Sequence, residues 1–511
     1  MRTREALTLV SVVAFLAGCA TSSLKLAPNA PDVPWTPATA ADGAIVAGVP
    51  SIASATPNSS YLLPSNPKAA GVVSEPQELD QSHSYTLPEL IDLAQSHNPL
   101  TRIAWQNARD AALAAGVAKS AYLPFLSATV VGAYQTGSNH ETIPGTPVNS
   151  DESLHGSISA LSVQWLLFDF GERSAVLSAA DQVSVAANIG FTAVHQELIY
   201  RVALAYYSHI AAKGRLTTAD KALRNAKGVQ DAAGSRYAHG VGTVLEVAQA
   251  RQGLAQCQLA LVQATGQAQD TYMALLAAMG ISPLTEIKVA ELGSRRLSPV
   301  LTGPVDQIVS EALARRPDVL SAYAAHEASL AKLRAAQAEF LPKVFLSATG
   351  SYASNTLDVT TLPGLGQMPA TINVPGTHYG ATVLLGITVP IYDGGLRRAL
   401  KGQARAQEAK TDSTLEQVRD EATREIVGAA NRVRTSLSAL DATDALSSAA
   451  QITFDSAMAA YRSGVGSITD ALRAETALLE AQNASTDAYS AALSSAATLA
   501  LAAGTLGSAP Q

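Results

Sequence analysis

Few side chains in this sequence have the type and spacing that catalysis or metal binding requires. The nine histidines are scattered, and His195 and His209, which share one helical stretch, lie fourteen residues apart. That spacing does not suit a pair of metal ligands, so packed or solvated histidines are expected. The sequence contains no GxxxxGKS/T, GxGxxG, GxSxG, HExxH or CxxC motif, which are the patterns of phosphate loops, nucleophile elbows, zinc proteases and redox sites. We therefore expect a protein that is not an enzyme, with no catalytic residues, no metal and no dissociable cofactor.

The first 18 residues have the pattern of a secretory signal peptide. Two arginines precede the apolar stretch Ala6–Leu16, which is too short for a membrane-spanning helix. The run Leu16–Cys19 resembles the bacterial lipobox, in which the cysteine becomes the lipidated first residue of the mature chain. The next residue is Ala20 rather than aspartate, which by resemblance to sorted lipoproteins indicates the outer membrane. We expect a covalent lipid on Cys19 to anchor the protein in outer-membrane lipid.

The composition favours closely packed helices and excludes a nucleic-acid partner. Apolar residues make up 47% of the 511 residues, aromatic residues 5% and charged residues 15%. The net charge is −7, and no run of lysine or arginine is present, so no basic surface is available for nucleic acid. The second cysteine, Cys257, lies in a helical stretch and is expected to be a packed thiol, because lipidation of Cys19 leaves it without a disulfide partner.

The chain divides into a tether and a duplicated unit. Residues 19–80 are dominated by Pro, Ala, Ser and Asn up to about Pro76 and predict an extended tether. Two similar halves follow, which we assign to 81–300 and 301–511. Paired motifs lie 218 residues apart early in the halves and 224 apart later: Asn98-Pro99 with Arg316-Pro317, Leu123-Pro124 with Leu341-Pro342, FDFGER (168–173) with YDGGLR (392–397), and RYAHGVGT (236–243) with AYRSGVGS (460–467).

Each half predicts a helix, two strands and a long helical hairpin. The four predicted strands carry no charged residue, and two of them alternate clearly between apolar and hydroxylated or small residues, which is the strand signal. They span residues 125–134, 157–168, 344–352 and 379–391. Strands of this length can cross a bilayer. The connecting segments Gln135–Gly156 and Ala353–His378 are long and polar or rich in Gly and Pro, as expected of external loops.

The helical stretches are unusually long. Residues 172–239 contain no proline, and as one helix they would reach about 100 Å. Glycine-bearing turns at 240–243 and 464–467 then interrupt the helices, and Thr243 and Ser467 are expected to cap the returning helices. Each half therefore contains one antiparallel coiled-coil hairpin.

Four membrane strands cannot close a barrel, because open edges in hydrocarbon leave backbone groups without hydrogen-bond partners. Two copies would give about eight strands and a filled interior, whereas three would give about twelve and room for a channel. Strand faces rich in Ser and Thr favour water inside, and hence three copies.

At this point the sequence resembles the TolC family of outer-membrane efflux factors, specifically its lipoprotein branch. The resemblance rests on the duplicated order of elements, the Leu-Pro at each helix-to-strand junction, FDFG and YDGG at each strand-to-helix junction, and RYAHGVGTVLEVAQAR and YRSGVGSITDALRAE at the hairpin tips. It implies a mostly α fold with a transmembrane β-barrel: a homotrimer whose twelve-stranded barrel stands on a long periplasmic α-helical barrel. Members dock on a periplasmic adaptor protein driven by an inner-membrane pump.

The hairpin tips are the candidate contact sites for the adaptor. The alternative is that their glycines only turn the chain; the polar residues that flank them in both repeats favour contact. The candidate residues are Arg236, Gly240, Val241, Gly242, Thr243, Arg462, Gly464, Val465, Gly466 and Ser467.

The resemblance also indicates a periplasmic gate just after the second tip. Family tubes close there through acidic residues, and Asp470 matches the first of them, whereas Arg473 stands where a second acidic residue can occur. A ring alternating Asp470 and Arg473 would hold the end shut by ion pairs between subunits. Glu246 is the counterpart of Asp470 in the first repeat. The alternative is an ordinary solvated helix face.

The leading function is therefore a passive exit duct of a tripartite efflux pump for small toxic compounds, with a proton-driven inner-membrane partner. One alternative is the same duct serving type I protein secretion. Another is a non-conducting coiled-coil lipoprotein that tethers the outer membrane, against which the four uncharged strands argue.

Overall fold

The computed structural model describes two compact units, Met1–Glu75 and Pro76–Gln511, which are treated separately. The predicted signal peptide, Cys19 and the predicted loop beyond Ala353 lie outside the described residues. Side chains are described except at 133, 135–156 and 353. The structure describes residues 26–28, 30–31, 37–47, 63, 65–66, 68–69, 79–80, 82–143, 146–292, 304–353 and 379–507.

The first unit contains a small hairpin where an extended tether was predicted. Strand β1 (Ala38–Thr39) pairs antiparallel with β2 (Ile45–Val46). Gly43 supports the turn between them with a φ of 78°, a conformation that glycine adopts without steric cost. An ion pair of 2.9 Å joins Lys68 to Asp42, so part of this Pro- and Ala-rich segment folds back on itself.

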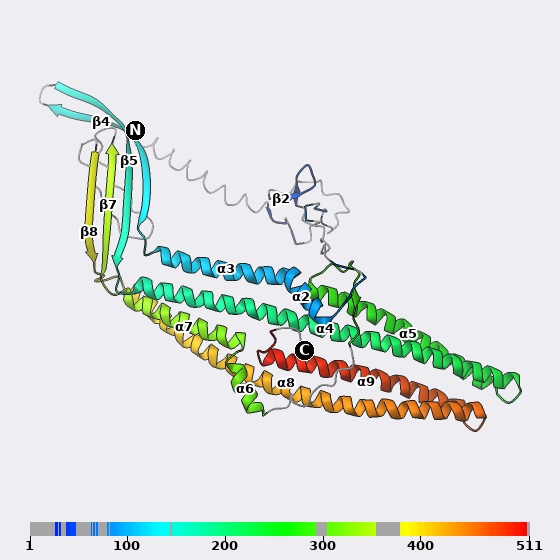
Figure 1. Ribbon diagram of the computed structural model, residues 1–511. Coiled ribbons are helices and arrows are strands. Elements are labelled where there is room, and N and C mark those ends of the chain that lie inside the picture. Colours follow the sequence, from blue (N-terminus) through cyan, green and yellow to red (C-terminus); the bar gives the residue numbers. More distant parts are fainter. Residues whose placement is uncertain are drawn as a thin grey trace. The chain divides into compact units, whose positions relative to one another are not determined.

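The second unit repeats one order of elements twice (Figure 1). The first pass comprises β3 (Ser84–Tyr85), α2 (Leu87–His97), α3 (Pro99–Ser120), β4 (Phe125–Ile143), β5 (Thr146–Phe168), α4 (Glu172–Ala238) and α5 (Val244–Met279). The second comprises β6 (Lys288–Val289), α6 (Val305–Leu313), α7 (Pro317–Ala338), β7 (Lys343–Ala353), β8 (Tyr379–Thr388), α8 (Leu396–Ser463) and α9 (Ile468–Ala502). Each half thus has the predicted helix, strand pair and helical hairpin.

The four long strands form one antiparallel sheet in the order β4-β5-β7-β8. One prediction was wrong: within the segment expected to be a loop, residues 135–143 continue β4 and residues 146–156 continue β5, and pairing runs from Phe125 opposite Gln164 to Ile143 opposite Thr146. Its polar side chains suggested a loop, but backbone groups form the ladder whatever the side chains are. Strand β8 ends at Thr388, three residues before the predicted end, because Pro390 cannot donate to a ladder.

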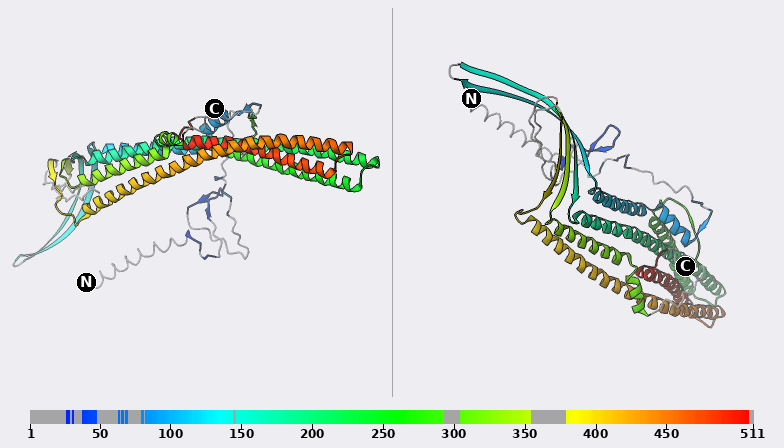
Figure 2. Two further views of the ribbon diagram at one scale, coloured as in Figure 1. Left: turned by 90° about the horizontal axis from the view of Figure 1, so that it is seen from below. Right: turned by 60° about the vertical axis from the view of Figure 1, so that its left-hand side comes forward.

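The helices pack into two long hairpins, α4 with α5 and α8 with α9, and α4 also packs against α9 (Figure 2). Helices α4 and α8 have 67 and 68 residues, or about 100 Å each. Alanine dominates the buried face of α4, and small side chains let helix axes approach closely. These alanines are Ala175, Ala179, Ala203, Ala211, Ala212, Ala219, Ala222, Ala226 and Ala233. None of the helices in the described part of the chain is long and apolar enough to span a membrane.

The main apolar cluster lies where α2 and the middle of α4 meet the C-terminal turns of α5 and α9. Leu90, Ile199, Val202 and Leu276 are almost completely buried there. Helix α2 begins with a capping box in which Thr86 and Glu89 satisfy each other's backbone groups, a strong helix-start signal. This cluster holds the two hairpins against α2.

Candidate functional site

The sheet has one apolar face and one hydroxylated face across all four strands. Residues directly opposite each other in an antiparallel ladder share a face, and the register places Leu126 opposite Val163 and Leu161 opposite Gly350. The apolar face is exposed at Leu126, Val130, Leu161, Val383, Leu385 and Ile387. The other face carries Ser127, Thr129, Ser162, Ser347, Thr349, Ser351 and Thr382. The alternation predicted for two strands therefore extends over the sheet.

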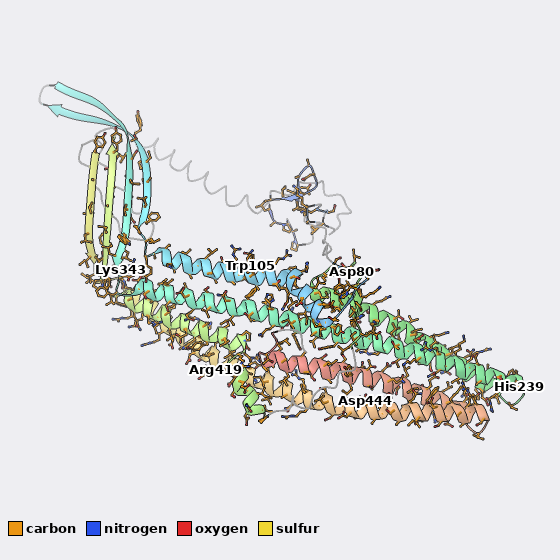
Figure 3. All side chains as sticks on the ribbon, in the orientation of Figure 1. Asp80, Trp105, His239, Lys343, Arg419 and Asp444 are labelled. Atoms are coloured by element: carbon orange, nitrogen blue, oxygen red, sulfur yellow. The ribbon has the colours of Figure 1, made fainter. Side chains whose placement is uncertain are left out.

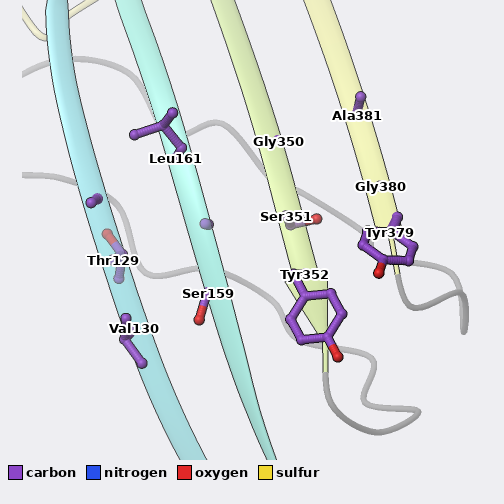
Figure 4. Close-up of a pocket in the computed structure, with 12 residues that line it drawn as sticks. Thr129, Val130, Ser159, Leu161, Gly350, Ser351, Tyr352, Tyr379, Gly380 and Ala381 are labelled. Atoms are coloured by element: carbon purple, nitrogen blue, oxygen red, sulfur yellow. The ribbon is translucent and has the colours of Figure 1, made fainter.

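Toward one end of the sheet, an open cleft of about 670 Å³ lies against the strands (Figure 4). Its lining is uncharged and consists mostly of small and hydroxylated residues. The ring centroids of Tyr352 and Tyr379 are 5.2 Å apart there. An uncharged surface of this kind offers no ligand set for a specific anion or metal.

Each long helix begins beside an aspartate–arginine pair at the sheet. Asp169 accepts hydrogen bonds from the backbone N–H and Nε of Arg173, at 2.9 and 2.8 Å. The Arg173 guanidinium also donates to the carbonyl oxygens of Ala121, Leu166 and Leu167. In the second repeat, Asp393 accepts from the backbone N–H and Nη1 of Arg397, both at 3.0 Å. These pairs fix the angle at which α4 and α8 leave the strands.

An ion pair also joins the two repeats at this junction. Lys343 Nζ lies 2.6 Å from Glu172 Oε2. Lys343 is the first residue of β7, and Glu172 is the first residue of α4. The pair therefore ties a strand of the second repeat to the helix of the first.

The hairpin tips need their glycines for the turn itself. Gly240 and Gly464 have positive φ values of 75° and 85°, which favour glycine. A Cβ at Gly242 would lie 2.9 Å from the backbone nitrogen of Tyr237, and one at Gly466 would lie 2.9 Å from Ala460 Cβ. The repeated glycines at the tips are therefore explained by the turn geometry and do not by themselves indicate a contact with an adaptor protein.

The predicted N-caps are confirmed at both tips. Thr243 Oγ1 accepts a hydrogen bond from the backbone N–H of Glu246 at 3.1 Å, and Ser467 Oγ accepts one from Asp470 at the same distance. Such caps satisfy a backbone donor that the helix leaves free. The turns are thus fixed in shape, and His239 marks the first of them in Figure 3.

Apolar side chains cover the outer ends of these turns. Val241 is 65% exposed and Val465 is 84% exposed, and Val244 and Leu245 beside them are exposed as well. Apolar residues on a rigid, exposed turn offer a contact surface for another protein. The sequence predicted the two valines but not Val244 and Leu245.

A polar cluster joins the two hairpins just inside the tips. Arg236 Nη1 donates to the carbonyl oxygen of Tyr461 at 3.3 Å, and its guanidinium lies 5.2 Å from the centre of the Tyr461 ring. The Tyr461 hydroxyl donates to Glu246 Oε2 at 3.2 Å, and Arg236 Nε lies 3.9 Å from the same oxygen. Burial, followed by the charge of Glu246, raises the pKa of Tyr461, so the hydroxyl remains a donor.

The structure separates residues that the sequence had grouped. Arg236 belongs to the cluster between the hairpins, whereas Arg462 is exposed and is the counterpart of Ala238. These two arginines are therefore not equivalent positions of the two repeats. Sequence reasoning missed Tyr461, although a tyrosine three residues before the first tip glycine, Tyr237 or Tyr461, is present in both repeats.

The three predicted gate residues have different surroundings within one chain. Asp470 is exposed, and its Oδ2 accepts a hydrogen bond from Ser467 Oγ at 2.7 Å. Arg473 is exposed on α9, and Glu246 contacts Tyr461. The expected ion pairs would form between copies of the chain, so the gate stays a prediction.

The profile of the family described as "Outer membrane efflux protein" matches residues 90–281 and 308–505. The chain belongs to this family, which confirms the resemblance drawn from its motifs, and it is an outer-membrane efflux channel protein. The two matched segments correspond to the two structural repeats.

Three individual proteins illustrate the relationship. The chain is 27% identical to protein CyaE of Bordetella pertussis over 401 residues, covering 78% of this chain and 80% of that protein. It is 29% identical to the pyoverdine export outer membrane protein OpmQ of Pseudomonas aeruginosa, covering 59% of this chain and 60% of OpmQ. The crystal structure of the CmeC outer membrane channel of Campylobacter jejuni superposes with a TM-score of 0.70 over 83% of this chain and 87% of CmeC, at 19% identity. The predicted TolC-like fold is thereby confirmed.

Proposed function

We propose that three copies of this chain form the passive exit duct of a tripartite efflux pump, which carries small toxic or amphiphilic compounds across the outer membrane. The observation that carries the proposal is the four-stranded sheet, with an exposed apolar face, a hydroxylated face and two edge strands, β4 and β8. An apolar face suits lipid, and edges in lipid must be paired. Pairing β4 of one copy with β8 of the next satisfies both.

Three copies suit a duct better than two. About eight strands enclose a space filled by side chains, whereas about twelve leave a lumen. The hydroxyl groups of Thr349 and Ser351 lie on the face opposite the exposed apolar one, and would line that lumen with groups that hydrogen-bond water. The duct does no chemistry, because energy enters at the inner-membrane partner, which we expect to be proton-driven.

The partner at the far end is a periplasmic adaptor protein that contacts the hairpin tips. Val241 and Val465 are exposed apolar groups there, and the glycine turns hold them in fixed positions. A lipid on Cys19 would add a second attachment to the outer membrane. The name of the relative OpmQ states export of pyoverdine for that protein.

Complementation of a deletion strain tests the proposal. Deletion should raise susceptibility to several small toxic compounds and leave protein secretion unchanged, whereas a duct for type I secretion would show the reverse. The double variant Val241→Asp, Val465→Asp should fail to restore resistance while still assembling in the outer membrane. Full restoration by this variant would contradict contact at the tips; Asp441→Asn, an exposed change on α8 well before the tip, serves as the control expected to restore resistance.

The gate has its own test in planar bilayers. Asp470→Ala with Arg473→Ala should raise the conductance of the isolated channel severalfold, because the ion pairs proposed to hold the end shut are removed. Glu480→Gln, an exposed change two to three helical turns further along α9, should leave the conductance unchanged. Equal conductance in wild type and the double variant would reject the gate.

A further inference from the structure

A buried carboxyl group lies between the two hairpins, two residues after Arg473 of the predicted gate. Glu475 on α9 is only 4% exposed, and its Oε1 has no hydrogen-bond partner among the residues that the structure describes. It lines a cleft of about 670 Å³ between α5 and α9, together with Gln249, Gln252, Gln256, Cys257, Arg473 and Glu480. A carboxylate in such a position is costly, because burial removes water without supplying another partner.

Within the described part of the chain, the groups that face Glu475 offer it no counter-charge. From α5 the titratable neighbour is the buried thiol of Cys257. Helices α4 and α8 contribute apolar groups to the core beside it, including Val229, Phe454 and Met458. The charged residues of these helices near this level are exposed or engaged elsewhere: Lys227, Asp231, Glu246, Arg251, Asp455, Arg473 and Glu480.

The electrostatics agree with this geometry. Burial raises the pKa of Glu475 from its usual 4.5 to about 7. Burial, with a further contribution from the charge of Glu475, raises the pKa of Cys257 to about 11. Both groups are thus neutral when the helices are packed in mildly acidic solution.

We propose that Glu475 is a protonation-dependent latch between the two hairpins: the neutral carboxyl group allows α9 to pack against α5, and the ionised carboxylate favours an arrangement in which water reaches it. The polar lining of the cleft supplies the route for that water. The control of duct opening by this latch rests on the proposed function, whereas the latch itself does not. The burial arises within one chain, so assembly can only add to it.

The direction of the pH effect follows from linkage. In the separated arrangement the carboxyl group has its usual pKa of 4.5, and in the packed arrangement about 7. The stability that the neutral carboxyl group gives to the packed arrangement is fully present below pH 4.5. It is lost as the pH rises from 4.5 to about 7. The ratio of separated to packed forms therefore rises at most tenfold per pH unit, reaching on the order of 100-fold in all, and is constant above about pH 7.

Cys257 is a built-in reporter of this separation. The purified full-length protein in detergent is treated with N-ethylmaleimide between pH 5 and pH 8, and modification of the Cys257 peptide is followed by mass spectrometry. Each wild-type rate is divided by the rate of Glu475→Gln at the same pH, which cancels the ionisation of an ordinary thiol. Ionised Glu475 by itself slows the labelling by raising the pKa of Cys257, so a faster wild-type rate reports exposure.

The expected ratio rises from a few-fold at pH 5 to on the order of 100-fold at pH 8. Glu475→Leu should behave like Glu475→Gln, and Glu480→Gln, a carboxyl group on the same helix and cleft, should follow the wild type. A ratio that stays constant with pH overturns the latch, whatever the channel does.

The conductance of the same proteins at pH 5 and pH 8 distinguishes a failure of the latch proposal from a failure of the proposed duct. Higher wild-type conductance at pH 8, absent in Glu475→Gln, supports control of opening. A pH-dependent labelling ratio with no conductance at any pH keeps the latch and contradicts the proposed duct. A pH-dependent ratio with conductance indifferent to the variant overturns the role of Glu475 in opening.

Discussion

The two repeats build the same strand-to-helix junction but stabilise it differently. Both place an arginine four residues after an aspartate, and both turn the chain through a left-handed glycine, Gly171 or Gly395. The Arg173 side chain is 11% exposed, and the Arg397 side chain is 31% exposed. Arg173 binds three carbonyl oxygens and lies 4.8 Å from the Tyr122 ring centre. The duplicated backbone geometry is therefore kept while its side-chain support has diverged.

The residue before that glycine also has more side-chain support in the first repeat than in the second. Phe170 has a φ of 53°, whereas the second repeat has Gly394 there with a φ of 68°. A non-glycine residue in this region costs about 1 kcal/mol or more, and the Phe170 ring stacks edge-to-face on Phe168 at 4.7 Å. The first junction is thus a packed joint and the second a glycine turn. We infer from this difference that side-chain contacts in the first repeat contribute more than those in the second to fixing the angle between the sheet and the long helices.

The largest effect is expected from removing the two junction arginines. Arg173→Ala leaves the buried Asp169 with backbone N–H donors but without its cationic partner, and should lower the free energy of unfolding by about 3 kcal/mol. Arg397→Ala, at a more solvated pair, should lower it by about 1 kcal/mol or less. Denaturant unfolding of the detergent-solubilised variants measures both, and equal losses would remove the distinction between the junctions.

A second comparison concerns the residue before the proline at the start of α3 and α7. Asn98 Nδ2 donates to the Ala278 carbonyl oxygen at 3.2 Å, and Arg316 Nη1 donates to the equivalent Ala502 oxygen at 3.1 Å. Both side chains thus close the end of a returning helix. Arg316 additionally pairs with Asp318 and Glu425, each at 2.6 Å, so the side chain that closes the helix end is part of an ion-pair network in the second repeat and is a neutral amide in the first.

This site should make the second repeat sensitive to acid. Burial disfavours ionisation of Asp318, but hydrogen bonds and charge from Arg316 outweigh it and hold the pKa of Asp318 below its usual 3.8. Because the pKa of Asp318 is lower in the folded protein, its ionised form stabilises the fold above pH 3.8, and this stabilisation is lost as the pH falls through the folded-state pKa. We expect Asp318→Asn to lower stability by about 1 to 2 kcal/mol at pH 7 and by less at pH 3.

The control for that prediction is the first repeat. Asn98→Ala should destabilise by about 1 kcal/mol to the same extent at pH 3 and pH 7, because Asn98 does not titrate. Thermal unfolding at the two pH values measures both variants. A loss for Asp318→Asn that does not change with pH would contradict the role assigned to its charge.

The smallest expected effect is at the tips, where equivalent tyrosines differ in their contacts. Tyr461→Phe removes the hydroxyl that donates to Glu246 and should weaken the link between hairpins by about 1 kcal/mol. Hydrogen exchange in the first turns of α9 should then be about fivefold faster. Tyr237→Phe, at an exposed tyrosine, should leave exchange unchanged. Similar exchange in both variants would show that the hydroxyl does not join the hairpins.

Local signals in the sequence predicted most of the fold, and tertiary packing decided what they missed. Period-two alternation in Val344–Tyr352 and the Gly-Val-Gly tips depend on local geometry, so the strand and the turns were predictable. The contact from Tyr461 to Glu246 joins residues 215 positions apart, and no local pattern encodes it. Glu475 stands near Arg473 and Thr476 in sequence, and only the packing of α9 against its neighbouring helices buries it.

The number of chains in the detergent-extracted protein tests the central claim most directly, because four strands with two edges form a duct only when copies close the sheet. Native mass spectrometry of outer-membrane extracts gives this number, and the same spectrum reads the lipid on Cys19. Our account predicts three chains. One chain, or two, would contradict it, since the strands would then stay open or the barrel would be too narrow to conduct.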